Sequence, residues 1–138
     1  MRRELGDGYE LDDDRARVDR VAVHAFLTTA YWATGRSREQ NDALIDNAYR
    51  VAGLYHGGAQ IGYARAVSDG ATVAYLADVY VLAEHRGRGL GVELVRFLVD
   101  EGPLAGVRKW VLHTSDAHDL YRRFGFAEPD ARLLERWR

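Results

Sequence analysis

The chain has no cysteine among its 138 residues and only two prolines. The absence of cysteine excludes disulfides and thiolate metal sites, argues against a thiol acyl-enzyme, and is compatible with a reducing cytosol. No apolar run reaches the roughly 18 residues of a membrane-spanning helix. No apolar stretch follows Met1-Arg2-Arg3-Glu4, as it would in a signal peptide. We therefore expect a cytoplasmic protein with no membrane partner.

A large excess of one sign of charge is also absent, because 19 Lys and Arg residues nearly balance 21 Asp and Glu residues and the formal net charge is −2. This balance gives no electrostatic footprint for nucleic acid, and we expect no such partner. The residues are 47% hydrophobic and 29% charged, which is typical of a globular protein. We find no linker, repeat or low-complexity segment, so the sequence predicts a single domain over residues 1–138.

Hydrophobic periodicity and turn residues predict alternating helices and strands. The expected strands are residues 9–11, 49–56, 60–67, 72–82, 109–113 and 133–137, and the expected helices are 18–29, 37–47, 92–100 and 117–124. Ser37 and Gln40 have the spacing of a capping box at the start of the second helix.

The order of these elements indicates a mixed α/β fold. Asp69-Gly70 lies between two apolar runs and predicts a hairpin, so residues 49–82 read as an antiparallel meander. One helix separates residues 72–82 from residues 109–113, which predicts that these two strands are parallel neighbours. We expect a mostly antiparallel sheet with helices on both faces.

The most informative segment is Arg86-Gly87-Arg88-Gly89-Leu90-Gly91, between an expected strand and an expected helix. Such a turn directs free backbone N–H groups to one point, where the helix dipole adds about half a positive charge. An anion, most naturally a phosphate, is the expected ligand. The glycine spacing does not match G-x-G-x-x-G, and no G-K-[ST] follows, so neither common nucleotide motif is present. The alternative is a plain connection.

Two motifs together resemble the GNAT superfamily of N-acetyltransferases. Arg86-x-x-Gly89-x-Gly91 looks like its acetyl-CoA loop, and Ala117-x-x-Leu120-Tyr121-x-x-x-Gly125-Phe126 looks like its second signature. The resemblance implies a sheet of six to seven strands with a splayed parallel pair at its centre. It implies acetyl-CoA as cosubstrate, no metal, and direct acetyl transfer to a small-molecule or peptide amine. It also leaves open a homodimer formed through the last strand, which carries Trp137.

The resemblance also implies which residues contact the cosubstrate. The strand residues Val79 and Val81 would line the pantetheine arm, and an amide at or beside Val81 would polarise the acetyl carbonyl. Many family members have Asn where this chain has Thr114, whose hydroxyl can still form one hydrogen bond. We expect Arg86 and Arg88 to contact the phosphates, although solvated turn arginines are common. The Gly87–Gly91 backbone is the firmer expectation.

Tyr121 is the candidate general acid for the leaving thiolate, because a phenol retains its proton at neutral pH. The alternative is that its ring only forms a wall of the channel. If the chain instead only senses or binds CoA without catalysis, Tyr121 is dispensable.

Asp78 is the first candidate for the general base, because a carboxylate inside an apolar strand is costly unless it faces a polar cavity. Burial would raise its pKa toward useful values. The alternatives are a structural carboxylate that pairs with an arginine or caps a backbone N–H, and a carboxylate that binds a cationic acceptor. His113, at the end of the next strand, is the second candidate in the acceptor pocket.

Tyr31 and Trp32 lie where the family places its acceptor wall, and an aromatic pair in a loop can hold a cation or an apolar group. The alternative is a cover over the core. We interpret Asp116 as the N-cap of the helix that begins at Ala117. The identity of the acceptor cannot be read from the sequence.

Overall fold

The computed structural model describes residues 1–138, and its centre is one six-stranded sheet with the order β1-β2-β3-β4-β5-β6. All neighbouring strands are antiparallel except β5 and β6, which are parallel. The strands are β1 (Arg2–Gly6), β2 (Tyr9–Asp12), β3 (Arg50–His56), β4 (Ala59–Ser68), β5 (Val73–Val81) and β6 (Lys109–Val111). The α-helices are α1 (Arg20–Leu27), α2 (Arg38–Asn47), α3 (Leu90–Val99) and α4 (His118–Arg122).

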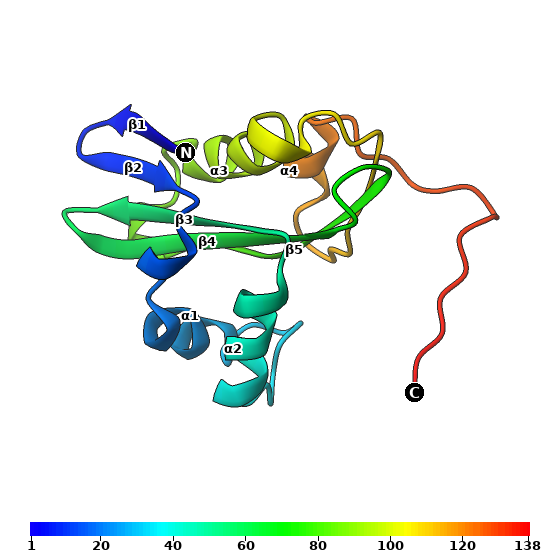
Figure 1. Ribbon diagram of the computed structural model, residues 1–138, viewed down its shortest axis with the longest axis horizontal. Helices are drawn as coiled ribbons and strands as arrows, with labels where there is room; N and C mark the ends of the chain where they lie inside the picture. Colours follow the sequence, from blue (N-terminus) through cyan, green and yellow to red (C-terminus); the bar gives the residue numbers. More distant parts are fainter.

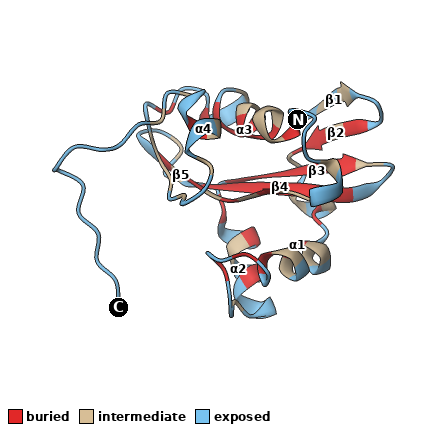
Figure 2. Cartoon of the chain, turned by 180° about the vertical axis from the view of Figure 1, so that it is seen from behind, coloured by how far each residue is buried: buried red, intermediate tan, exposed pale blue.

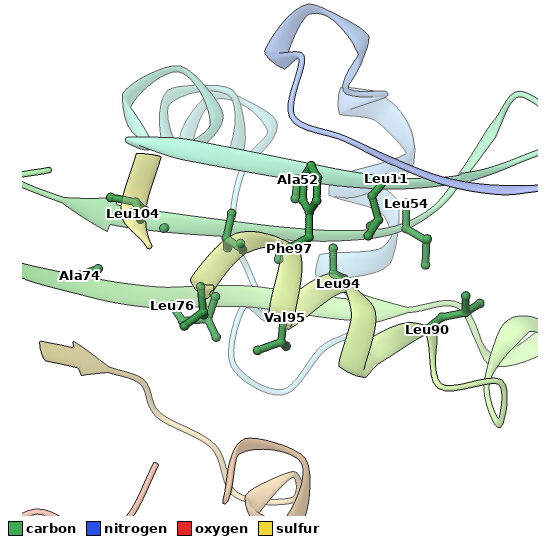
Figure 3. Close-up of a cluster of buried hydrophobic side chains, with 14 of the residues drawn as sticks. Leu11, Ala52, Leu54, Ala74, Leu76, Leu90, Leu94, Val95, Phe97 and Leu104 are labelled. Atoms are coloured by element: carbon green, nitrogen blue, oxygen red, sulfur yellow. The ribbon is translucent and has the colours of Figure 1, made fainter. Parts of the chain in front are cut away.

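Helices cover both faces of the sheet, α1 and α2 on one side and α3 and α4 on the other (Figure 1). On the α3 side, Leu94 and Phe97 pack against strand residues such as Leu54 and Leu76, forming the larger core (Figure 3). On the other side, a smaller core contains Leu27 and Ile45 from the helices and Tyr63 and Tyr80 from the sheet. The central strands are thus buried on both faces (Figure 2).

Local sequence signals position the first two helices. The Asp19 carboxylate accepts a hydrogen bond from the Ala22 amide at 3.0 Å at the start of α1. Ser37 and Gln40 form both bonds of the predicted capping box, each at 3.0 Å. These bonds satisfy amide groups that a helix start otherwise leaves unpaired. The capping box of α2 therefore fixes the end of the α1–α2 loop, residues 28–37, at Ser37.

Strand β5 contains a bulge at Asp78. Tyr63 pairs with Tyr80, but Arg65 pairs with Ala77, so β5 contributes one residue more than β4 over this interval. Asp78 has a φ of 56°, a conformation that only Asn, Asp and Gly visit readily. The extra residue changes the side-chain alternation, so Leu76 faces the α3 core while Tyr80 faces the α1–α2 core.

Strands β5 and β6 are paired over a short distance only. Their register runs from Val73 opposite Lys109 to Tyr75 opposite Val111, where β6 ends. Strand β5 continues to Val81 with no strand on that side. From Leu76 onward this edge of β5 therefore has no strand partner, and the region beside it is called the gap.

The structure confirms the mixed fold, the meander, the Asp69-Gly70 hairpin and the parallel pair. It corrects three expectations. The parallel pair lies at the edge of the sheet instead of its centre, because β6 is the last strand. Residues 133–137 form no strand, and they belong to an extended C-terminal segment in which Leu134 and Trp137 are 89% and 83% exposed (Figures 1 and 2). Strand β1 was not predicted, because its side chains are exposed or half-buried and lack an apolar run.

None of the helices has the length and apolarity needed to cross a membrane.

Buried tyrosines make the fold sensitive to alkali. Burial raises the pKa of Tyr55 and of Tyr121 to about 12, and it also raises the pKa of Tyr63 and Tyr80 above the ordinary value. Between pH 10 and 12 the unfolded chain loses these protons while the folded chain keeps them. The free energy of unfolding should therefore be fully retained below pH 10 and fall as the pH rises toward 12. Urea unfolding at stepped pH measures this, and a constant midpoint across the interval would contradict it.

Candidate active site

The glycine segment forms an open corner between β5 and α3. Gly87 and Gly89 have φ values of 82° and 75°, which residues with a Cβ rarely adopt, and Gly89 is the N-cap of α3. No atom lies within 4 Å of the position that a Cβ would take on Gly87, Gly89 or Gly91. The corner is accessible, not filled by side chains.

Free backbone donors converge at this corner. The N–H groups of residues 88–92 donate to no acceptor in the protein, and no side chain caps the helix. The Leu90 side chain is buried in the larger core and fixes the first turn of α3. Together with the helix dipole, these amides supply the unpaired donors that an anion site requires, and the binding of an anion here stays a prediction.

The two arginines of the segment differ in their contacts. Nε of Arg86 donates to the Val81 carbonyl oxygen at 2.9 Å, so this side chain folds back over the end of β5. The Arg88 guanidinium lies 5.9 Å from the centre of the Tyr9 ring. Phosphate contacts by either side chain stay a prediction, and the backbone remains the better-supported part of the site.

The Val81 amide faces the gap beside β5. The amide of the next residue, Leu82, donates to the Ile61 carbonyl of the β4 side at 2.8 Å. Because successive strand amides point in opposite directions, the Val81 N–H points away from β4 and into the gap. Val79 packs against the larger core, and its contact with a cosubstrate stays a prediction.

Thr114 and Tyr121 lie at the start and in the middle of the second motif. The Thr114 hydroxyl accepts the amides of Asp116 and Ala117 at 3.4 and 3.0 Å, and no side chain caps α4. Asp116 is thus not the N-cap that we expected, because Thr114 already satisfies this turn. The Tyr121 side chain is buried, and this burial raises its pKa to about 12. Its hydroxyl keeps its proton at neutral pH and has no protein partner.

The loop between α1 and α2 bridges the two sides of the gap. The Tyr31 hydroxyl accepts the Ser115 amide at 3.0 Å, which ties the loop to the segment that follows β6. Trp32 Nε1 donates to Asp78 Oδ1 at 3.0 Å, which ties the same loop to the bulge of β5. The predicted aromatic wall therefore lies over the gap, with both side chains still exposed.

Asp78 is held by two arginines. Its Oδ2 accepts Arg65 Nε at 2.6 Å and Arg36 Nη1 at 2.9 Å, and the residue is only 5% exposed. Burial alone would raise the pKa of Asp78, but Arg65 and Arg36 outweigh it, and the pKa lies below its usual value. The raised pKa that we expected is wrong. The alternative of a carboxylate paired with arginine describes the geometry, and a carboxylate with a lowered pKa is a poor proton acceptor.

His113 has a partner on each ring nitrogen. Nδ1 lies 2.5 Å from the Tyr75 hydroxyl, and Nε2 lies 2.6 Å from a carboxylate oxygen of Glu135 in the C-terminal segment. The imidazole is half exposed beside the paired part of β5 and β6. Its contact with an acceptor stays a prediction.

A cavity of about 890 Å³ lies between β6, α4 and residues 126–133. Tyr121, Thr114 and His113 line it, whereas no residue of the glycine corner does. It is bounded on one side by the exposed C-terminal segment. We therefore locate the candidate site by the free amides and the gap, and not by the size of this cavity.

Comparisons with known proteins agree with this geometry. The family model described as "Acetyltransferase (GNAT) family" matches residues 8–126. A solved protein from Xanthomonas campestris pv. campestris, described as belonging to the GNAT family, is 37% identical, with a TM-score of 0.88 over 94% of this chain and 92% of that one. Glucosamine-6-phosphate N-acetyltransferase from Arabidopsis thaliana shares the fold alone, with 14% identity and a TM-score of 0.66 over 94% and 99% of the chains.

The curated relatives match over a shorter stretch. "Probable glucosamine 6-phosphate N-acetyltransferase 2" from Oryza sativa subsp. japonica is 38% identical over 65 residues, which is 46% of this chain and 39% of that protein. The matched stretch thus spans well under half of that relative. The family model and the Xanthomonas structure nevertheless cover most of the chain. The chain belongs to the GNAT family of acetyltransferases.

Arg36, Arg65 and Tyr75 lie in the site but were not singled out from the sequence. Arg65 carries the signal that drew attention to Asp78, a charge inside an otherwise apolar strand. Two opposite charges in successive strands of one meander could have indicated an ion pair. Arg36 and Tyr75 have no comparable signal.

The charge of Asp78 can be separated from its shape. In Asp78→Asn the amide keeps the size and tolerates the positive φ, but two buried guanidinium groups lose their counter-charge. We expect the free energy of unfolding to fall by about 3 kcal/mol, measured by urea unfolding.

The exposed Asp42→Asn serves as control, with an expected loss below about 1 kcal/mol. An Asp78→Asn protein with unchanged stability and abolished acetyl transfer would contradict the structural role and support the general base.

Proposed function

We propose that this protein is an acetyl-CoA-dependent N-acetyltransferase that transfers the acetyl group directly to an amine in a ternary complex. The observation that carries the proposal is the open corner of unpaired amides at residues 88–92, at the end of a strand whose edge is uncovered. Pyrophosphate fits such a corner, and an extended pantetheine arm can pair with an uncovered strand edge. The family membership supports the same cosubstrate.

Two groups are suited to the chemistry of a thioester. The Val81 N–H points into the gap and can donate to the developing oxyanion of the acetyl carbonyl. The Tyr121 hydroxyl keeps its proton at neutral pH and can donate it to the leaving thiolate as the carbon–sulfur bond breaks. With a pKa of about 12, the resulting phenolate is strongly basic and regains a proton from solvent. The chain has no cysteine to carry an acyl group, which supports direct transfer.

The acceptor reaches the thioester from the α1–α2 side. Helices α3 and α4 cover the opposite face (Figure 1), whereas Tyr31 and Trp32 border the gap on this side. A related rice protein and a fold neighbour are named for glucosamine 6-phosphate, an amine, which agrees with an amine acceptor here.

A substitution at Gly91 should affect cosubstrate binding and helix stability in opposite directions. Gly91→Ala adds a good helix former in the first turn of α3, so the free protein should gain up to about 1 kcal/mol of stability. The new methyl group enters the open corner, and we expect acetyl-CoA to bind roughly tenfold more weakly by calorimetry.

Gly106→Ala, at another uncrowded glycine outside the corner, is the control and should leave the affinity unchanged. The proposed cosubstrate site is refuted if the parent protein takes up no acetyl-CoA at millimolar concentration.

Tyr121→Phe tests the general acid and distinguishes an enzyme from a CoA-sensing module. Loss of the proton donor should lower kcat about 100-fold while KM for acetyl-CoA changes little, measured by CoA release with an acetylated amine. Tyr49→Phe, at an exposed tyrosine distant from the gap, should behave as the parent. If the parent and Tyr121→Phe turn over every amine tested at the same rate, Tyr121 is not the general acid, and its ring only forms a wall of the channel.

A further inference from the structure

The guanidinium of Arg65 is only partly used by the protein. Its Nε donates to Asp78, but neither Nη nitrogen has a partner. The residue is only 9% exposed. Both Nη atoms are nevertheless accessible to solvent, because neither is among the unpaired side-chain atoms that are fully buried. The terminal edge of this guanidinium is therefore open to a ligand, while the rest of the side chain is fixed by burial and by the bond to Asp78.

Arg36 adds a second incompletely paired guanidinium. Its Nη1 donates a hydrogen bond to Asp78, whereas its Nε and Nη2 have no acceptor in the protein. The Arg36 side chain is 15% exposed. No other carboxylate pairs with either arginine. The cluster of Arg36, Arg65 and Asp78 thus has two positive charges and one negative charge.

The cluster lies where an acceptor would approach. Asp78 forms the bulge in β5 just ahead of the strand end whose amide faces the gap. Trp32 donates to the same carboxylate, so the aromatic wall and the cluster adjoin each other. Asp78 holds both guanidinium groups in place on the α1–α2 side of the gap.

We propose that the free edges of Arg65 and Arg36 bind an oxyanion of the acceptor, so that the substrates are amines that carry a carboxylate or a phosphate group. This inference rests on the proposed function. Guanidinium groups bind both oxyanions through paired N–H donors, and burial strengthens such bonds. The cationic acceptor that Asp78 alone suggested is disfavoured, because its carboxylate already accepts three bonds and the net charge of the cluster is positive.

The experiment first saturates the protein with CoA, which occupies the glycine corner. Inorganic phosphate and acetate are then titrated by calorimetry and by thermal unfolding. We expect at least one of them to bind and stabilise the CoA-bound parent. In Arg65→Lys and Arg36→Lys the charge beside Asp78 is retained but the free fork is lost, so anion affinity should fall at least tenfold with the unfolding temperature nearly unchanged.

Arg20→Lys is the matched control, because Arg20 pairs with Asp46 and Asp42 on the same helical layer but outside the cluster. Its anion affinity should equal that of the parent. Acetyl transfer to L-phenylalanine against L-phenylalaninamide, and to glucosamine 6-phosphate against glucosamine, gives a second readout. The ratio of kcat/KM should favour an anionic member in the parent and fall at least tenfold in Arg65→Lys.

The outcomes distinguish the two proposals. Failure of CoA itself to bind refutes the proposed function. CoA binding without any phosphate or acetate binding refutes the oxyanion site alone, as does equal anion binding by Arg65→Lys and the parent. A preference for the carboxylate pair or the phosphate pair identifies which oxyanion the site selects.

Discussion

The ion pair between Asp78 and two arginines determines how the active side of this molecule is arranged. It holds a left-handed residue inside a strand, a conformation that costs energy and that needs surrounding contacts to persist. The bulge fixes the phase of β5 beyond it and so the direction of the Val81 amide. The same carboxylate anchors Trp32 and with it the loop between α1 and α2. Strand, loop and arginines thus depend on one buried charge.

Much of the framework could be predicted from local signals. The capping box of Ser37 and Gln40, the Asp69-Gly70 hairpin and the helix that follows Gly89 are encoded within a few residues. The parallel pairing of β5 and β6 followed from chain connectivity. The glycine corner was found because a strand, a glycine turn and a helix start leave amides unpaired in any such context.

Features that depend on distant contacts could not be predicted. The bulge depends on the contact between Asp78 of β5 and Arg65 of the neighbouring strand β4. This contact also lowers the pKa of Asp78, which burial alone would have raised. Residues 133–137 have an apolar pattern typical of a strand, but a strand also requires a neighbour, which these residues lack. Strand β1 forms despite a polar sequence because β2 supplies its hydrogen bonds.

The two halves of the candidate site use different kinds of groups. Backbone amides form the corner for the cosubstrate, so that part depends on the fold and on glycine. The acceptor that we propose would be bordered by side chains on the meander and the α1–α2 loop, namely Arg65, Arg36, Trp32 and Tyr31. Binding through the backbone is compatible with many acceptors, because the bordering side chains can change without altering the corner.

The single inserted residue in β5 has a consequence for any exchange of segments between such domains. Before Asp78, the even-numbered Ala74 and Leu76 face the core under α3. After Asp78, the odd-numbered Val79 and Val81 face that core, and Tyr80 faces the α1–α2 core. A splice that omits this position would invert every later side chain of the strand. A chimaera that takes the glycine turn from another protein must therefore take the bulge residue with it, because the bulge sets which way the strand enters the turn.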